Sequence, residues 1–237
     1  TQRNFGFPQS RKRAFILGIK KDYKKISSEL YRLFTAELQR HMEEVDVFTL
    51  WDAIADLPPL EAKTIKNATY SESAAWGYTF AGMHDNLPGY VQLVNRGLPQ
   101  RVPLLNHRSK YNNDRDIQIY QLLRPGEKSD AESIQEINPY KSRADIFRDK
   151  FDKLLADKPC KAITAHMYYD CNMYIHPYQA RGLTPREAAR VQGFPDDYLF
   201  LGSPNEWYRQ IGNAVSPLMA RVLASGLKQV LERIYRA

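Results

Sequence analysis

The sequence predicts an α/β fold with an irregular domain inserted into it, and three observations support this prediction. A short apolar run at residues 14–17 is β-prone and ends at Gly18, which is typical of a buried strand. Apolar residues recur at spacings of three and four over residues 20–45 and 218–234, which indicates two long helices. Residues 61–175 lie between them, are rich in Tyr, Asn, Gly and Pro, and lose this periodicity, as a loop-rich domain does.

The bulk properties favour a nucleic-acid partner. The 237-residue chain is long enough to bury a sizeable core, as one large or two small domains. Its formal net charge of +7 and its pI near 9.3 favour a polyanionic partner, because binding releases counterions from phosphates. No apolar run approaches the length of a membrane span, and no secretory signal opens the chain. Cys160 and Cys171 lack metal-ligand spacing, so we expect a cytoplasmic protein without a metal site.

Capping signals place the first helices. Ser27 or Ser28 is a candidate cap for the first of the two long helices. Thr49 predicts a short helix over residues 50–55, which the diproline at 58–59 ends. The diproline also predicts a domain boundary.

The irregular segment contains weaker signals. We expect helices over 113–123 and 144–155, a mobile loop over 126–139, and a pair of strands within 158–177. Basic and aromatic residues interleave here, which suits phosphate contacts and stacking on bases. A solvated surface with aromatic rings packed beneath it explains any single residue equally well. The interleaved residues are Arg108, Lys110, Tyr111, Arg115, Lys141, Arg143, Arg148, Tyr168 and Tyr169.

The stretch 183–215 carries the sharpest local signals. Thr184 is a helix cap, Glu187 completes a capping box, and Gly193 ends the helix. Arg186 and Arg190 lie four residues apart, so both guanidinium groups emerge on one helix face. On its own, such a helix is most often a solvated face.

A second signal follows at once. Gly212-Asn213 predicts a tight turn, and Ser216-Pro217 begins the last helix. The R-E-x-x-R-x-Q-x-F-P segment at 186–195 and the Q-x-G-N-A-V segment at 210–215 resemble, in order and spacing, the last two motifs of the DNA cytosine-5 methyltransferases. The resemblance implies part of a doubly wound, Rossmann-like sheet of an S-adenosylmethionine-dependent methyltransferase, with an inserted target-recognition domain.

The start of the chain carries the second part of the resemblance. Gln9, Arg11 and Arg13 alternate, so on extended backbone they point to one face, as on a basic strand edge. The pattern G-x-P-Q-x-R-x-R before an apolar run is similar to the eighth motif of the same family. The resemblance implies that Arg13 approaches the oxygen of a flipped cytosine, while Gln9 and Arg11 shape the contacts around the base. A fixed guanidinium there would stabilise developing charge, and the base must first leave the stack.

The resemblance also implies a division of the chain and further roles. Residues 1–58 would belong to the catalytic domain, 59–206 to the target-recognition domain, and 207–237 to a return segment with the donor-contacting turn. That turn would hold the S-adenosylmethionine site, with alanine where some members have serine. The implied donor residues are Asn213, Ala214 and Val215, and the residues implied to brace the recognition region and its DNA contacts are Arg186, Arg190 and Gln192.

Three features of that family are absent from the sequence: a glycine-rich donor-binding motif, a Pro-Cys-Gln nucleophile loop and a Glu-Asn-Val motif. Cys160 follows a proline, but it comes after the eighth motif and precedes Lys161, which excludes it as the nucleophile. The resemblance therefore covers the family's carboxy-terminal half, and we expect no turnover by this chain alone. The expected partners are double-stranded DNA and an amino-terminal catalytic half, either a separate subunit or another segment of the same polypeptide.

A second hypothesis is a non-catalytic DNA-binding module descended from such an enzyme. Arg13 and Asn213, which match base and donor contacts, have no evident purpose in a pure binder. A basic α+β domain with neither function would leave both motifs unexplained.

Overall fold

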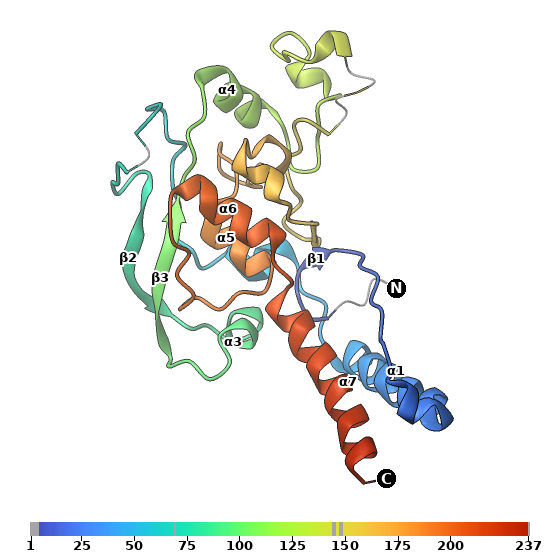
Figure 1. Ribbon diagram of the computed structural model, residues 1–237. Coiled ribbons are helices and arrows are strands. Elements are labelled where there is room, and N and C mark those ends of the chain that lie inside the picture. The colour runs from blue at the N-terminus through green and yellow to red at the C-terminus, as the bar shows by residue number, and fades with distance from the viewer. Residues whose placement is uncertain (1–4, 69, 144–145, 147–148, 237) are drawn as a thin grey trace.

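Short strands and helices form the main lobe of the molecule, and two long helices project from it (Figure 1). The computed structural model describes residues 5–68, 70–143, 146 and 149–236. Within these residues, no helix is both long enough and apolar enough to cross a bilayer.

The projecting helices are α1 (Ser27–Glu44) and α7 (Pro217–Tyr235), which lie side by side (Figure 1). They run antiparallel, and Arg233 near the end of α7 donates to Glu29 near the start of α1 at 2.6 Å. Gly226 lies where they cross, since a Cβ there would come within 2.8 Å of α1 side chains. Both helices were expected, although α1 begins without a side-chain cap.

The largest strand pair is an antiparallel hairpin of β2 (Gly77–Asp85) and β3 (Arg101–Arg108). Its register pairs the first residue of each strand with the last residue of the other, with an irregularity between Phe80 and Met83. The connection carries the short helix α3 (Tyr90–Val94), whose three buried residues anchor it to the core.

A second, parallel pair joins distant parts of the chain: β1 (Gln9–Ser10) lies beside β4 (Cys160–Lys161). The strand predicted over residues 14–17 does not form, and residues 11–20 have no regular secondary structure. No strand among the described residues lies beside this segment to share its backbone hydrogen bonds, and Ile16 is 99% exposed. The described sheets are therefore two two-stranded ladders, and the doubly wound sheet stays a prediction.

Capping chemistry fixes the shorter helices where the sequence predicts them. Thr49 and Asp52 form a capping box at α2 (Leu50–Ile54). Asn113 caps α4 (Asp114–Leu122), accepting a bond from the Asp116 amide at 2.9 Å. These two predictions are confirmed.

Two helices, α5 (Pro185–Val191) and α6 (Pro204–Asn213), lie within the main apolar core together with the first turn of α7. Ser216 caps α7, as predicted. The predicted turn at Gly212-Asn213 is wrong, because these residues form the end of α6. The domain boundaries near 58 and 206 stay predictions.

Two further predictions are wrong where they can be checked. Residues 149–155 are not helical, and the rest of the predicted helix at 144–155, with Arg148, lies largely outside the described residues. Residues 158–177 form β4 and two 3-10 helices instead of two strands, since their backbone bonds go to other parts of the core. The 3-10 helices are η1 (Lys21–Ile26), η2 (Glu132–Ile134), η3 (Lys141–Arg143), η4 (Ala165–Tyr168) and η5 (Asn172–Tyr174).

The contact between α6 and η4 makes a prediction. A Cβ on Gly212 would lie 2.1 Å from the Ala165 amide nitrogen and 2.2 Å from the Thr164 carbonyl carbon. The backbone atoms cannot move aside without disturbing the packing of η4. Gly212→Ala should therefore lower the free energy of unfolding by about 3 kcal/mol or more, measured by urea unfolding. Gly18→Ala is the matched control, because nothing lies within 4 Å of its Cβ position. Equal stability of the two variants would contradict this packing.

Candidate functional site

Helix α5 is buried along its whole length although it carries three charged side chains. The capping box fixes its start: Thr184 accepts from the Glu187 amide, and Glu187 accepts from the Thr184 amide at 2.7 Å. Arg186 and Arg190 are both 0% exposed, so neither guanidinium lies at the surface to meet DNA. Buried charges must be paired, and the pairs show what the helix holds in place.

Arg190 joins α5 to two carboxylates. It donates to both oxygens of Asp196 at 2.8 Å and to Asp56 at 2.5 Å. Burial opposes charge on Asp196, but Arg190 more than offsets this effect and holds the carboxyl pKa far below its usual range. His84, on β2, lies 3.3 Å from Asp196 and 3.5 Å from Asp56, which fastens the hairpin to the same cluster.

Arg186 joins α5 to backbone. It donates to the carbonyl oxygens of Leu105 on β3 at 2.7 Å, Pro195 at 2.9 Å and Tyr198 at 2.6 Å. Burial lowers the pKa of Arg186 to about 10. The hairpin and the loop after α5 are therefore both fixed by one buried guanidinium.

The third charged side chain of α5, Glu187, pairs with Arg181. Arg181 donates two hydrogen bonds to the Glu187 carboxylate, of 2.8 and 2.7 Å. His107 and His176 lie in the same buried region, and burial lowers the pKa of each to about 4. Nδ1 of His176 accepts the backbone amides of Tyr178 and Gln179 at 3.1 Å, so the neutral ring has a structural role.

A relay of two glutamines connects the three motif segments. Gln9 is fully buried; it donates to Gln192 Oε1 at 2.7 Å and accepts from the Ile163 amide at 3.0 Å. Gln192, just after α5, donates in turn to the Ala214 carbonyl at 2.8 Å. Gln9 and Gln192 therefore meet although they are 183 residues apart in the sequence. We call the contact of Gln9, Gln192 and Ala214 the glutamine junction.

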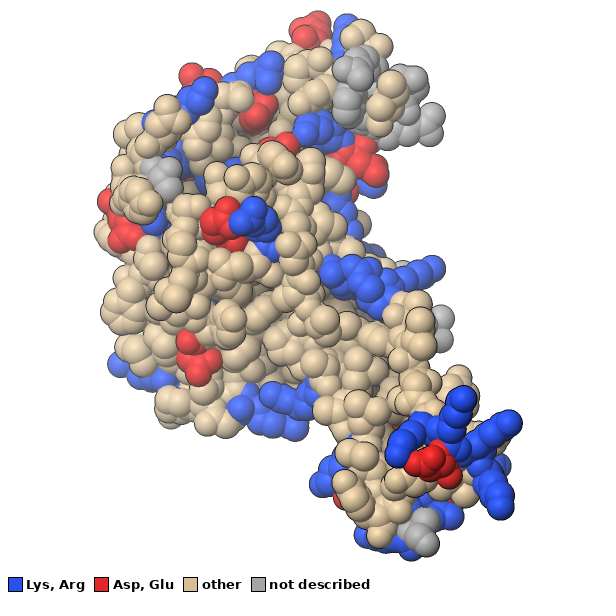
Figure 2. Space-filling view, viewed as in Figure 1, with Lys and Arg blue, Asp and Glu red and all other residues tan. Residues whose placement is uncertain are grey.

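The two arginines after Gln9 behave differently. Arg11 donates to the Ile163 carbonyl at 2.5 Å and to the Gly212 carbonyl at 3.5 Å, so it tightens the same junction. Arg13 is exposed and donates to the carbonyl of Lys12. Basic side chains gather on the segment that follows β1 and on the far end of the projecting helices (Figure 2). Arg13 is thus presented at the surface beside the junction.

Of the predicted donor residues, Asn213 ends α6, and Ala214 and Val215 follow it. Asn213 and Val215 are exposed, Val215 by 60%, while the Ala214 carbonyl is held by Gln192. The two exposed side chains are available to a ligand, and the backbone between them is held by the hydrogen bond from Gln192 to Ala214.

Neither Cys160 nor Cys171 is suited to act as a nucleophile. Burial raises the pKa of Cys160 to about 12 and that of Cys171 to about 11, so both remain thiols at neutral pH. The described residues contain no group of His, Cys, Asp or Glu side chains that could hold a metal ion.

Sequence reasoning missed the partners of the α5 charges. Asp196 follows Arg190 by six residues in the G-F-P-D segment, and this spacing is the signal that could have suggested a buried pair. Asp56 and Leu105 carry no local signal, because they come from elements more than 80 residues away.

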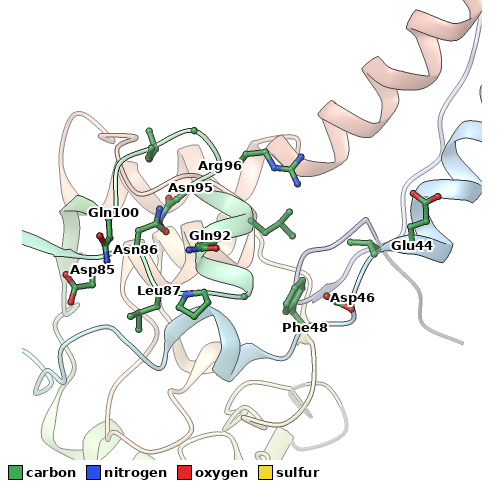
Figure 3. Close-up of a pocket in the computed structure, with 16 residues that line it drawn as sticks. Glu44, Asp46, Phe48, Asp85, Asn86, Leu87, Gln92, Asn95, Arg96 and Gln100 are labelled. Carbon is green, nitrogen blue, oxygen red and sulfur yellow. Dashed lines mark hydrogen bonds between the residues drawn. The ribbon is translucent and has the colours of Figure 1, made fainter.

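The largest cavity described, about 970 Å³, lies elsewhere, between the end of α1 and the loop that joins β2 to β3 (Figure 3). Polar side chains such as Asn86, Gln92 and Asn95 face it, and Phe48 closes one side. None of the predicted site residues lines it, so we place the candidate site at the glutamine junction.

Comparison with known proteins identifies the family. The model of the C-5 cytosine-specific DNA methylases matches residues 2–229. The chain belongs to this family. Members generally use S-adenosylmethionine as the methyl donor.

Several methylases resemble the chain over almost its whole length. A type II methyltransferase of Bacillus paralicheniformis is 32% identical over 96% of this chain and 49% of its own length. A type II methyltransferase of Desulfomicrobium norvegicum is 28% identical over 98% of this chain and 53% of its own length. An E. coli prophage-encoded structure described as a DNA modification methyltransferase has a TM-score of 0.63 and 26% identity, over 97% of this chain and 58% of that one. The chain thus spans about half the length of these relatives.

The buried arginines of this methylase chain predict a large difference between two substitutions. Arg190→Ala leaves Asp196 and Asp56 buried without their cation, which should cost about 3–5 kcal/mol of unfolding free energy. Arg40→Ala removes an arginine with two carboxylate partners at the surface of α1, and little change is expected. Urea unfolding of both variants tests this. A small loss at Arg190 would show that the cluster does not hold the fold.

The two buried histidines predict a pH dependence. The folded state keeps His107 and His176 neutral down to about pH 4, whereas the unfolded chain protonates them near 6.5. Their contribution is therefore fully present above pH 6.5 and declines as the pH falls towards 4, by up to about 1.4 kcal/mol per pH unit for each. Urea unfolding between pH 7.5 and 4.5 measures it, and His176→Gln should flatten the slope. A flat wild-type profile would contradict the assignment.

Proposed function

We propose that this chain is the DNA-recognition and base-supporting half of a DNA cytosine-5 methyltransferase, whose nucleophilic cysteine lies in an amino-terminal half outside this sequence. The observation that carries the proposal is the glutamine junction. Gln9, Gln192 and Ala214 belong to the three segments that resemble the eighth, ninth and tenth motifs, and hydrogen bonds join them. A pure DNA binder would have no need to fix a donor turn to a base-supporting segment.

Cytosine-5 methylation needs the base and the methyl donor to be held close together, and the glutamine junction would do this. A cysteine thiolate from the other half would add to carbon-6 of a cytosine that has left the stack. S-adenosylmethionine would supply the methyl group for carbon-5, after which the carbon-5 proton and the thiolate leave. Arg13 would place its guanidinium at the base oxygen as charge develops there, and Arg11 and Gln9 would hold the backbone that carries it. Asn213, at the end of α6, and Val215, in the link to α7, are exposed, which suits contact with the donor.

The surface supports the existence of a second half. Phe15 and Ile16, in a segment with strand-like sequence, are 45% and 99% exposed, and Leu227 and Leu231 on α7 are 41% and 50% exposed. Apolar groups gathered on such elements mark an interface. The relatives are about twice as long as this chain, so the proposed occupant is the amino-terminal half of the enzyme.

Arg186, Arg190 and Gln192 would act indirectly in DNA recognition. Their side chains hold the β2–β3 hairpin, the loop after α5 and the donor turn, and none of them is exposed. Base and phosphate contacts would then come from exposed residues of the recognition region.

Arg13→Ala in the assembled enzyme tests the proposal. It should reduce methyl transfer to duplex DNA at least about a hundredfold, as loss of one electrostatic donor does, while binding of the duplex changes little. The neighbouring variant Lys12→Ala removes the same charge without the proposed contact and should keep most of the transfer. Unchanged transfer by Arg13→Ala would refute the role given to this arginine.

Donor binding separates the enzyme from the non-catalytic DNA-binding module. Calorimetry should detect S-adenosylmethionine binding once both halves are present, and Asn213→Ala should weaken it. A complex that binds DNA but never the donor would favour the binding module.

A further inference from the structure

An exposed tyrosine stands between two cavities beside the junction. The first, of about 390 Å³, is lined by Ala165, His166, Tyr168, Tyr169, Arg209 and Asn213. The second, of about 270 Å³, has Tyr169 in its lining too. Its basic lining residues are Lys63, Lys66, Arg108 and Lys110. Tyr169 is itself 72% exposed, although Met167, two residues before it, is buried.

The support of Tyr169 is rigid. It follows η4, whose backbone is in direct contact with Gly212. The ammonium group of Lys110 holds the end of η4 by donating to the carbonyls of Met167 at 3.2 Å and Tyr168 at 2.7 Å. The backbone that carries Tyr169 is thus held against the end of α6, where Asn213 lies.

The ring environment leaves aromatic surface open. Tyr168 meets Tyr169 edge-on, with centroids 5.0 Å apart and planes at 88°, and Arg209 lies 5.5 Å from the Tyr168 ring. His166 approaches Tyr169 at 5.5 Å with planes tilted by 46°. Edge-on and tilted contacts support a ring without covering both faces, which a stacking partner requires.

The charges around the second cavity favour a polyanion. Lys63 and Lys110 donate to backbone carbonyls. Arg108 lies 3.3 Å from Glu72, and Arg209 pairs with Glu206. Asp170 adds one more carboxylate nearby and pairs with Lys150 at 2.8 Å. Cations therefore outnumber carboxylates at the second cavity, whereas Arg209 is the one Lys or Arg side chain among the described residues that line the first. An excess of cations on one side of Tyr169 suits a phosphate beside a stacked base.

We propose that Tyr169 is a stacking residue for a nucleobase left without its neighbour when the target cytosine leaves the duplex, with the basic second cavity holding an adjacent phosphate. This inference rests on the proposed function, because it needs the DNA to lie at the glutamine junction. Opening a duplex exposes base faces, and stacking one of them on an aromatic ring offsets part of the cost. Tyr169 would be a positioning residue that acts on the DNA beside the reacting base.

A duplex with a single abasic site tests this, because it already has the gap that base flipping would create. The probe duplex carries 2-aminopurine next to the abasic position, so stacking is read as quenching and affinity is read from the same titration. The wild-type chain should bind this duplex more tightly than the intact duplex of the same sequence. Tyr169→Ala should lose about tenfold of that preference and most of the quenching, whereas Tyr169→Phe should keep both.

The matched control is Tyr178→Ala, which removes another exposed tyrosine (63% exposed) that packs edge-on against Trp51. It should leave preference and quenching unchanged. If Tyr169→Ala behaves like this control while salt-dependent binding of both duplexes persists, the stacking role is overturned and the proposed function stands. If the wild-type chain binds neither duplex, both are overturned. Thermal unfolding of the variants verifies that each is folded.

Discussion

Burial of three charged side chains on one short helix is the constraint on which this structure depends. A guanidinium or carboxylate inside a protein is tolerated only when its charge and hydrogen bonds are met there. Helix α5 has too few polar partners of its own, so Arg186, Glu187 and Arg190 take theirs from Arg181, Asp196, Asp56 and backbone carbonyls. The need to neutralise α5 thereby brings the β2–β3 hairpin, the segment after α2 and the loop after α5 to fixed positions around it.

The candidate site lies at the end of this helix. Gln192 directly follows α5, and its amide joins Gln9 to Ala214. Because Gly212 has no side chain, α6 packs directly against the backbone at the start of η4. This contact brings the segments that carry Asn213 and Tyr169 close together. The segments that carry Tyr169, Arg13 and Asn213 are therefore held by the same buried contacts. Each of these three residues still exposes its side chain to a ligand. This division explains why residues with the strongest motif signals can be fully buried and still matter for function.

Local chemistry was predictable from the sequence, and long-range pairing was not. The caps at Thr49, Asn113 and Thr184 depend on residues within three positions, so a short stretch of sequence suffices to place those helices. The burial of Arg186 and Arg190 could not be predicted, because their partners Leu105 and Asp56 are remote in sequence. The strand expected at 14–17 needs a neighbour that the described residues do not provide, and Gly212-Asn213 looks like a turn when the α6 cap at Ser203 is overlooked.

The central claim is that this chain supplies one half of a cytosine-5 methyltransferase, and the most direct measurement is the mass of the species that transfers methyl groups. Protein from native cells would be separated by size, each fraction assayed for methyl transfer to cytosine in duplex DNA, and the active fraction weighed under native and denaturing conditions. We expect an active species well above 27.5 kDa that contains a Pro-Cys-Gln segment together with this sequence. Methyl transfer by a lone 27.5 kDa chain would contradict it.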